Sequence, residues 1–435
     1  MLRKLTLPVL LSFIVPFVVA ANLKDSRNKV FSANELKQEA PPADQTVNSV
    51  IQWNRTLLTI VRTPGAQPAT IHSTRSFAIM HAAIYDAVNS ILNTHKPYMI
   101  QPPGVAADAS PDAAAAAAAH EVLVQLYPTF QSMLDSQLET SLAQVPDGTP
   151  KTSGMQLGVM VADQMLALRA NDGSGATPPA FTPGMNPGDY QSTPPNFPKA
   201  AFTGWAQVTP FALAHANQFR PGPPPALTSR TYAKAFNEVM ELGEDTSTAR
   251  TPDQTEIGRF WGGAIQNYWN EIAQTAAIAK NLNVADTARL FALLNLTFAD
   301  TVIAFYDAKY TYTFWRPITA IRAADTDGNP KTSPNPNWLA LSNTAPDPSY
   351  PVAHAAISNA GSEVLAFFFD RDRINLDVTS ETLPGVVRSF KGFSEAADEA
   401  TISRVYAGQH FSFDLSAGKR LGRKVGAFVL ENFLN

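Results

Sequence analysis

Apolar residues recur at intervals of three and four along most of this 435-residue chain, whereas alternating runs of β-branched residues are almost absent. Intervals of three and four place side chains on one face of an α-helix, while a strand requires an interval of two. The clearest stripe consists of Phe77, Met80, Ile84, Val88 and Ile91. The sequence therefore predicts a fold that is mainly α-helical.

The predicted helices form two groups, separated by a long segment that is rich in proline. Those before it cover about residues 51–60, 75–91 and 111–142, and the third contains seven consecutive alanines. Small side chains favour close packing of helices, and alanine has the highest helix propensity. Those after it cover about residues 229–243, 252–280, 285–315, 353–369 and 396–432.

The segment between the two groups, residues 176–226, contains twelve of the 34 prolines. Fifty residues without helical periodicity are uncommon inside a globular chain, and such segments are usually functional when they are ordered. We expect a long surface loop that shapes an entrance. It divides a domain of residues 48–435 into an N-terminal helical half, 48–175, and a C-terminal half, 227–435.

The N-terminus has the three parts of a secretory signal peptide: a basic start, an apolar run and small residues. Residues 1–20 form this signal, with cleavage expected near Ala20 or Ala21, and residues 21–47 form an exposed leader. The apolar run is shorter than the ~20 residues of a spanning helix, although an uncleaved anchor is the alternative. We expect no later stretch to be long and apolar enough to span a bilayer, and therefore a soluble protein that is secreted or periplasmic.

Composition excludes several classes of function. The 33 Lys and Arg residues are outnumbered by 37 Asp and Glu residues, which gives a net charge of −4 and argues against nucleic-acid binding. The chain has no cysteine, so thiol nucleophiles, iron–sulfur clusters and cysteine-ligated zinc are excluded. Metal chemistry is left to the seven histidines and the carboxylates.

The first chemically distinctive segment is residues 309–317, in which aromatic residues surround Lys309 and Arg316. Residues seven apart lie two turns from each other on the same face of a helix. Pro317 disfavours helical geometry at the preceding residue, so the helix is expected to end at Arg316. Two solvated charges are the alternative interpretation.

The second segment, residues 348–356, is a proline-rich turn that leads into a helix with His354 in its first turn. Amides at a helix N-terminus are free to bind an anion, and the helix dipole lowers the pKa of a histidine there. A buried histidine with a structural role is the alternative.

The third segment, residues 403–414, contains Arg404, Gly408, His410 and Asp414. Gly408 allows a close approach to the helix. Asp414 is one turn beyond His410 and is expected to accept a hydrogen bond from its ring, which fixes the tautomer that presents the other nitrogen to a ligand. Together, the three segments predict a site for a tetrahedral or trigonal-bipyramidal oxyanion, with one histidine on the central atom and the other transferring protons.

The order Lys-x6-Arg-Pro, Pro-x-x-His and Ser-Arg-x3-Gly-x-His resembles the signature shared by vanadium-dependent haloperoxidases and type 2 phosphatidic acid phosphatases. The resemblance covers about residues 48–430 and is greatest to the soluble, secreted haloperoxidase-like branch. It implies an all-α fold with two four-helix bundles and a site that binds vanadate or phosphate. The residues that it assigns to the oxyanion oxygens are Lys309, Arg316, Ala353 through its amide, and Arg404.

The resemblance also implies catalytic roles for three residues. His410 is the axial ligand of vanadium, or the nucleophile on phosphorus in a phosphatase. His354 is the acid–base residue, and Lys309 polarises an oxygen for attack by halide. Asp414 would accept a hydrogen bond from the ring nitrogen of His410 that does not contact the ligand.

Two departures from the family pattern stand out. The family's Pro-Ser-Gly-His is replaced by Pro351-Val352-Ala353-His354, which removes a hydroxyl donor. A hydrogen bond to a charged group contributes about 1.5–3 kcal/mol, so oxyanion affinity is expected to fall roughly ten- to a hundredfold. In addition, Gly262-Gly263 lies where a supporting carboxylate is expected in halogenating members.

The leading interpretation is a secreted vanadate-dependent haloperoxidase that oxidises halide with hydrogen peroxide and passes it to an organic acceptor. A non-specific acid phosphatase with a phosphohistidine at His410 is the first alternative. A degenerate oxyanion-binding protein is the second alternative.

Two other polar clusters are interpreted as structural: residues 325–329 as a turn and the pair His81 and Asp86 as buried packing.

Overall fold

The computed structural model describes residues 47–435, which form one compact unit. The predicted signal peptide and all but the last residue of the predicted leader lie outside the described residues. The regular secondary structure of this unit is almost entirely helical, which confirms the predicted fold class. Its one sheet within residues 47–435 is a small antiparallel hairpin of β1 (Leu376–Thr379) and β2 (Val387–Phe390).

The N-terminal helices pack around the alanine-rich segment. They are α1 (Ser49–Arg62), α2 (Thr74–Leu92), α3 (Pro111–Leu126), α4 (Gln131–Leu142) and α5 (Thr149–Arg169). The predicted helix 111–142 is interrupted by a 3₁₀ turn, η1 (Pro128–Phe130). Helix α5 was not predicted, because its apolar period is weak and it relies on Gly154 and Gly158, where a Cβ would collide with carbonyl oxygens at Ser110 and Ala114.

The C-terminal helices are shorter than their periodicity predicted. They are α6 (Arg230–Leu242), α7 (Pro252–Phe260), α8 (Ile265–Ala279), α9 (Val284–Tyr312), α10 (Pro317–Arg322), α11 (Ala353–Phe368), α12 (Phe393–Tyr406) and α13 (Ser412–Asn432), with a 3₁₀ turn η3 (Ala324–Thr326). The predicted helices 252–280 and 396–432 are each divided by a break that contains glycine, at Gly262-Gly263 and at Gly408.

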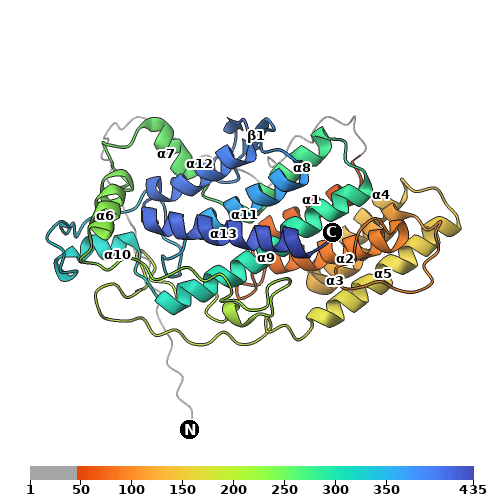
Figure 1. Cartoon of the computed structure of the whole chain (residues 1–435), viewed down its shortest axis with the longest axis horizontal. Helices are drawn as coiled ribbons and strands as arrows, with labels where there is room; N and C mark the ends of the chain where they lie inside the picture. The colour runs from red at the N-terminus through yellow and green to blue at the C-terminus, as the bar shows by residue number, and fades with distance from the viewer. Residues whose placement is uncertain (1–46) are drawn as a thin grey trace, which may run out of the picture. The chain divides into compact units, whose positions relative to one another are not determined.

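Helix α9 joins the two groups of helices (Figure 1). It packs against α1, α2 and α3 of the first group and against α8, α11 and α13 of the second. By length and composition α9 could cross a membrane, so the expectation that no later stretch is that apolar was wrong. In the structure, 94% of the most apolar 18-residue window of α9 is buried. A helix that other helices surround is apolar on all sides, which explains the composition of α9.

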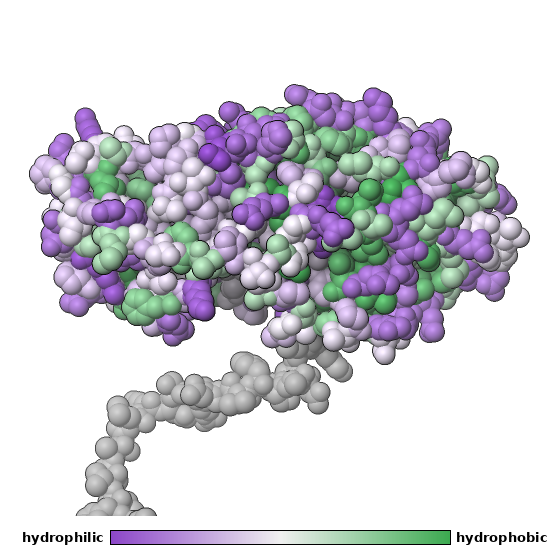
Figure 2. Space-filling model, turned by 90° about the horizontal axis from the view of Figure 1, so that it is seen from below, coloured by the Kyte–Doolittle hydropathy of each residue, from purple (hydrophilic) through white to green (hydrophobic). Residues whose placement is uncertain are grey.

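The proline-rich segment runs along one side of the helices, from α5 to α6 (Figure 1). Its one helical piece is the 3₁₀ turn η2 (Trp205–Gln207). Asp300 of α9 anchors it by accepting hydrogen bonds from three consecutive backbone amides, those of residues 211–213, at 2.6–2.7 Å. Figure 2 views the molecule from this lower side and shows that hydrophilic and hydrophobic residues are interspersed on the surface. Within the segment, Met185 is 92% exposed.

Candidate active site

The three chemically distinctive segments meet where several helices end. Lys309 lies in the last turn of α9, Arg404 in the last turn of α12, and His354 in the first turn of α11, while Arg316 and His410 lie just before α10 and α13. Apart from His354, these side chains are at most 4% exposed. Buried charges are costly unless they are paired, so their gathering indicates a site for negative charge.

Arg316 reaches the site from a different direction than predicted. Helix α9 ends at Tyr312 because Thr313 takes the left-handed conformation, with φ 44°, and its amide donates to the carbonyl of Lys309 at 2.8 Å. Lys309 and Arg316 therefore do not share a helical face, and that prediction was wrong. Arg316 has extended backbone, φ −84° and ψ 155°, as a residue before proline prefers.

Asp347 is a member of the cluster that sequence reasoning missed. Its backbone carbonyl accepts from Arg316 Nε at 2.7 Å, and its Oδ1 accepts from Arg316 Nη2 and lies 3.5 Å from Lys309 Nζ. The available signal was an acidic residue between two prolines, Pro346 and Pro348, just before the second segment.

The charges in this cluster shift one another's pKa values. Burial acts to raise the pKa of Asp347, but Lys309 and Arg316 outweigh it and hold that pKa below the ordinary value. Burial lowers the pKa of Lys309 to about 8, against the opposing effect of Asp347. Lys309 is therefore still mostly protonated at pH 7.

The tautomer of His410 follows from its neighbours. Arg316 Nη1 lies 2.8 Å from His410 Nε2, and because arginine has no acceptor, Nε2 must present a lone pair. The ring proton then lies on Nδ1, which is 3.2 Å from Asp414 Oδ2. Ser349 Oγ donates to the same carboxylate oxygen at 2.6 Å, a contact that the sequence analysis did not foresee.

The environment keeps His410 neutral. Burial, and then the charges of Arg316, Lys309 and Arg404, hold its pKa well below the ordinary value. Burial raises the pKa of Asp414 to about 6. His410 and Asp414 were predicted on one continuous helix, whereas His410 precedes α13 and Asp414 lies in its first turn; the expected contact between them is nevertheless present.

His354 and Arg404 converge on one backbone oxygen. The carbonyl of Trp261, in the break between α7 and α8, lies 2.9 Å from His354 Nε2 and accepts from Arg404 Nη1 at 3.2 Å. A carbonyl only accepts, so Nε2 of His354 carries the proton and Nδ1 keeps the lone pair. Desolvation, and then the charge of Arg404, hold the pKa of His354 well below the ordinary value.

Arg404 is a buried cation without a carboxylate partner among residues 47–435. Its Nε has no hydrogen-bond partner, and burial, followed by the charge of Arg316, lowers its pKa to about 10. The three cations Lys309, Arg316 and Arg404 thus have one paired carboxylate among them, Asp347, which contacts Lys309 and Arg316. An orphaned guanidinium donor and this excess of positive charge fit an oxyanion with several oxygens, such as vanadate or phosphate.

The start of α11 contributes a backbone donor but no hydroxyl. Ala353 is the first residue of α11, so its amide belongs to the turn whose amides have no acceptor within the helix. The side chain of Val352 is fully buried in an apolar cluster with Tyr350, Phe411 and Leu415.

Gly408 is required for a close approach, as the sequence predicted. Its φ is +74°, and a Cβ at this position would collide with the carbonyl oxygen of Gly243 and lie 2.8 Å from the Cβ of Ala340. The chain's own backbone, not a ligand, makes the close approach that the sequence suggested. The turn at Gly408 places His410, two residues further on, in the cluster.

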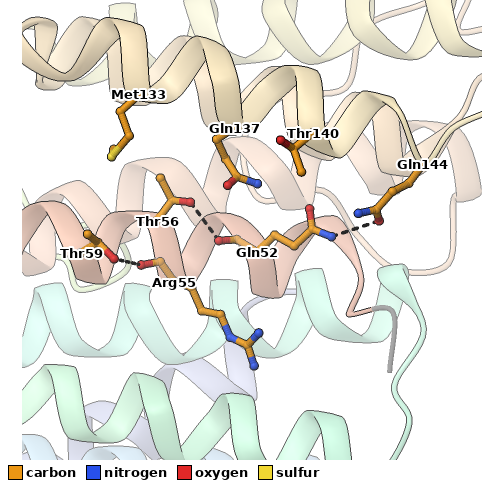
Figure 3. A pocket seen from close by; sticks show the side chains of 8 residues that line it. All are labelled: Gln52, Arg55, Thr56, Thr59, Met133, Gln137, Thr140 and Gln144. Carbon is orange, nitrogen blue, oxygen red and sulfur yellow. Dashed lines mark hydrogen bonds between the residues drawn. The ribbon is translucent and has the colours of Figure 1, made fainter. Parts of the chain in front are cut away.

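Two features of the N-terminal half lie apart from this chemistry. A cavity of about 420 Å³ lies between α1 and α4 and is lined mainly by glutamine and threonine. Its lining includes no histidine or carboxylate. Arg55 of α1 points away from α4 (Figure 3). His81 and Asp86 are buried and bind Asn54 and the amides of residues 98–100, respectively, as the structural interpretation expected.

Comparisons with known proteins relate this chain to the vanadium haloperoxidases. Residues 289–435, which carry all three segments, match a family model described as the VCPO second helical-bundle domain. The vanadium chloroperoxidase of Curvularia inaequalis is 26% identical in an alignment that covers 87% of this chain and 81% of that protein.

Solved structures extend the likeness to most of the fold. The first bacterial vanadium-dependent iodoperoxidase superposes with a TM-score of 0.75 at 26% identity, over 88% of this chain and 95% of that one. A holo-type bacterial vanadium-dependent chloroperoxidase gives a TM-score of 0.68 at 17% identity, over 88% of this chain and 97% of that one. For the chloroperoxidase, the likeness concerns the fold alone.

Proposed function

The chain is related in sequence and fold to the vanadium-dependent haloperoxidases, and we propose that it is itself a vanadate-dependent haloperoxidase, which oxidises halide ions with hydrogen peroxide. One observation carries this proposal: His410 is neutral, with its Nε2 lone pair directed into a cluster of three buried cations. The reaction consumes hydrogen peroxide, a halide ion and a proton, and it yields hypohalous acid and water.

Vanadate at this site would supply an electron-poor centre that activates hydrogen peroxide without a change in its own oxidation state. His410 Nε2 is the atom that would ligate it, and Asp414 and Ser349 hold the ring in the required tautomer. The charged donors Lys309, Arg316 and Arg404, with the Ala353 amide, would bind its oxygens.

His354 is the residue placed to move protons. Its Nε2 is fixed on the carbonyl of Trp261, so Nδ1 is the atom that accepts a proton from hydrogen peroxide. Because its pKa is held low, the protonated ring releases the proton again readily. Lys309, with its pKa lowered to about 8, donates hydrogen bonds that polarise an oxygen at the site.

The first alternative, a phosphatase, is favoured by the same histidine geometry. A neutral imidazole with an unprotonated Nε2 is also the nucleophile that a phosphohistidine mechanism needs. The missing hydroxyl at Val352 would weaken the binding of vanadate and phosphate alike, so this residue does not discriminate between the two activities.

The deciding experiment measures both activities of the purified protein with and without vanadate. Oxidation of iodide, bromide and chloride by hydrogen peroxide is followed spectroscopically, and hydrolysis of p-nitrophenyl phosphate is followed in parallel. The proposal expects vanadate to activate halide oxidation and H410A to abolish it. Phosphate-ester hydrolysis that vanadate inhibits would indicate the phosphatase, and vanadate binding without either activity would indicate a degenerate oxyanion-binding protein.

We further propose that the protein is exported after cleavage near Ala20 or Ala21, on the basis of the N-terminal sequence pattern. N-terminal sequencing of the protein recovered from the medium or periplasm tests this. An intact Met1 in the exported fraction would contradict it.

A further inference from the structure

We propose that Asp347 is a built-in anion of the oxyanion site, which competes with an incoming oxyanion for Lys309 and Arg316. Asp347 is thereby a determinant of oxyanion affinity that the family signature does not contain. The inference deepens the proposed function and rests on its premise that the site binds an oxyanion.

The hydrogen-bond donors of Lys309 and Arg316 are nearly all in use. The ammonium group of Lys309 contacts the carbonyl oxygens of Pro348 and Ser349 and lies 3.5 Å from Asp347 Oδ1. Arg316 uses Nε and Nη2 on Asp347 and Nη1 on Gln409 O and His410 Nε2. An ammonium has three N–H donors and a guanidinium has five, so this side of the site is close to saturated.

Asp347 also keeps the reactive nitrogen of His410 covered. Arg316 Nη1 donates to His410 Nε2 at 2.8 Å, at the atom that would bond to vanadium or phosphorus. The other two nitrogens of the guanidinium are held by the carbonyl and carboxylate of Asp347. Arg316 must leave the lone pair before His410 can bond to a central atom, and its ion pair with Asp347 opposes that movement.

Arg404 provides the contrast on the other side of the site. It is 3% exposed and its Nε has no partner, and the acceptor that its guanidinium contacts is the carbonyl of Trp261. An oxyanion therefore finds free donors on Arg404 first. It can bind Lys309 and Arg316 only if its oxygens displace the carboxylate of Asp347 from these two cations.

The sign of a substitution follows from this competition. Asp347→Asn keeps the size of the side chain and removes its charge, so Lys309 and Arg316 lose their internal anion. Hydrogen bonds with an ionised partner are roughly twice as strong as neutral ones, so phosphate competes with a strong internal acceptor in the wild type. Without that carboxylate, phosphate should bind at least about tenfold more tightly. If Asp347 instead only positions Arg316, the same substitution weakens binding.

Titration calorimetry with inorganic phosphate at pH 7 and fixed ionic strength tests this, with vanadium-51 NMR of added vanadate as a second measurement. Asp398→Asn is the matched control, because Asp398 is exposed and pairs with Lys419, so this variant has the same net charge as Asp347→Asn. We expect tighter binding for Asp347→Asn and wild-type binding for Asp398→Asn.

The outcomes separate this inference from the proposed function. If the wild-type protein binds phosphate and a folded Asp347→Asn variant binds it equally or more weakly, the role of Asp347 is overturned and the proposed function stands. Absence of binding in both proteins would overturn the oxyanion site itself and, with it, the proposed function. If Asp347→Asn does not fold, Asp347→Ser, which also removes the charge, is measured in its place and decides in the same way.

Discussion

Arg316 Nη1 lies 2.8 Å from His410 Nε2, and this contact between a cation and an imidazole decides the protonation of the ring. Arginine only donates, so the histidine accepts and its proton is placed on the side of Asp414. The same contact covers the nitrogen that would ligate vanadium. His410 therefore already has the tautomer that can ligate vanadium, with its proton on Nδ1. Arg316 has to move away from Nε2 when an oxyanion binds.

Replacing Arg404 by methionine should weaken oxyanion binding strongly without destabilising the empty protein. Arg404 is buried and has no carboxylate partner within residues 47–435, so an apolar side chain of similar size removes an uncompensated charge. We expect an unchanged or higher melting temperature without ligand and a roughly ten- to hundredfold loss of phosphate affinity. Thermal unfolding with and without phosphate measures both.

Arg388→Met is the control for that experiment. Arg388 pairs with Asp253, Glu256 and Glu399, away from the site. Arg388→Met should lower the melting temperature of the protein without ligand. Phosphate should raise the melting temperature of this variant by as much as it raises that of the wild type. A large loss of stability in Arg404→Met without ligand would show that the guanidinium is compensated within the protein.

Val352→Thr should restore the donor that the family pattern contains. Threonine has the shape of valine, with a hydroxyl in place of one methyl, and burying that hydroxyl in the apolar cluster costs about 1–3 kcal/mol until a ligand accepts from it. We expect a lower melting temperature and about tenfold tighter vanadate binding. Val352→Ala should lose stability with no gain in affinity, and equal affinities for the two variants would refute the role of the hydroxyl.

The charge of Lys309 should give anion binding an alkaline limit. Its pKa is lowered to about 8, chiefly by burial, so the ammonium is about 90% protonated at pH 7 and about 10% at pH 9. Affinity for sulfate, whose own charge is constant in this range, should therefore fall about tenfold between pH 7 and pH 9. Calorimetric titration measures this, and Lys309→Met should bind sulfate weakly with a flat profile; the same decline in that variant would assign the titration to another group.

Gly408→Ala should disturb both the fold and the site. A left-handed backbone costs a residue other than glycine about 1 kcal/mol, and the added Cβ also collides with Gly243. Gly385 has a similar φ of +85°, and a Cβ added there would have no atom within 4 Å, so Gly385→Ala carries the conformational cost alone. Chemical denaturation should show a greater loss for Gly408→Ala, together with weaker phosphate binding because His410 follows two residues later.

Much of the helical framework could be predicted from local patterns. The interval of apolar residues identified most helices, although the weakly periodic α5 was missed and the breaks at Gly262-Gly263 and Gly408 were not predicted. The three motif segments were recognisable because their spacing is short. The contact between His410 and Asp414 was predictable for the same reason, since residues four apart around a helix start are neighbours whatever the rest of the chain does.

The sequence by itself determined an all-α chain with lysine, arginine and histidine in three short segments. Tertiary structure alone decided which atoms meet: Asp347 with Arg316, Ser349 with Asp414, and the carbonyl of Trp261 with both His354 and Arg404. These partners are 31 to 143 residues apart along the chain. No local periodicity encodes such contacts, because they depend on how the helix ends and loops pack against one another, and the charges and tautomers of the site depend on those contacts.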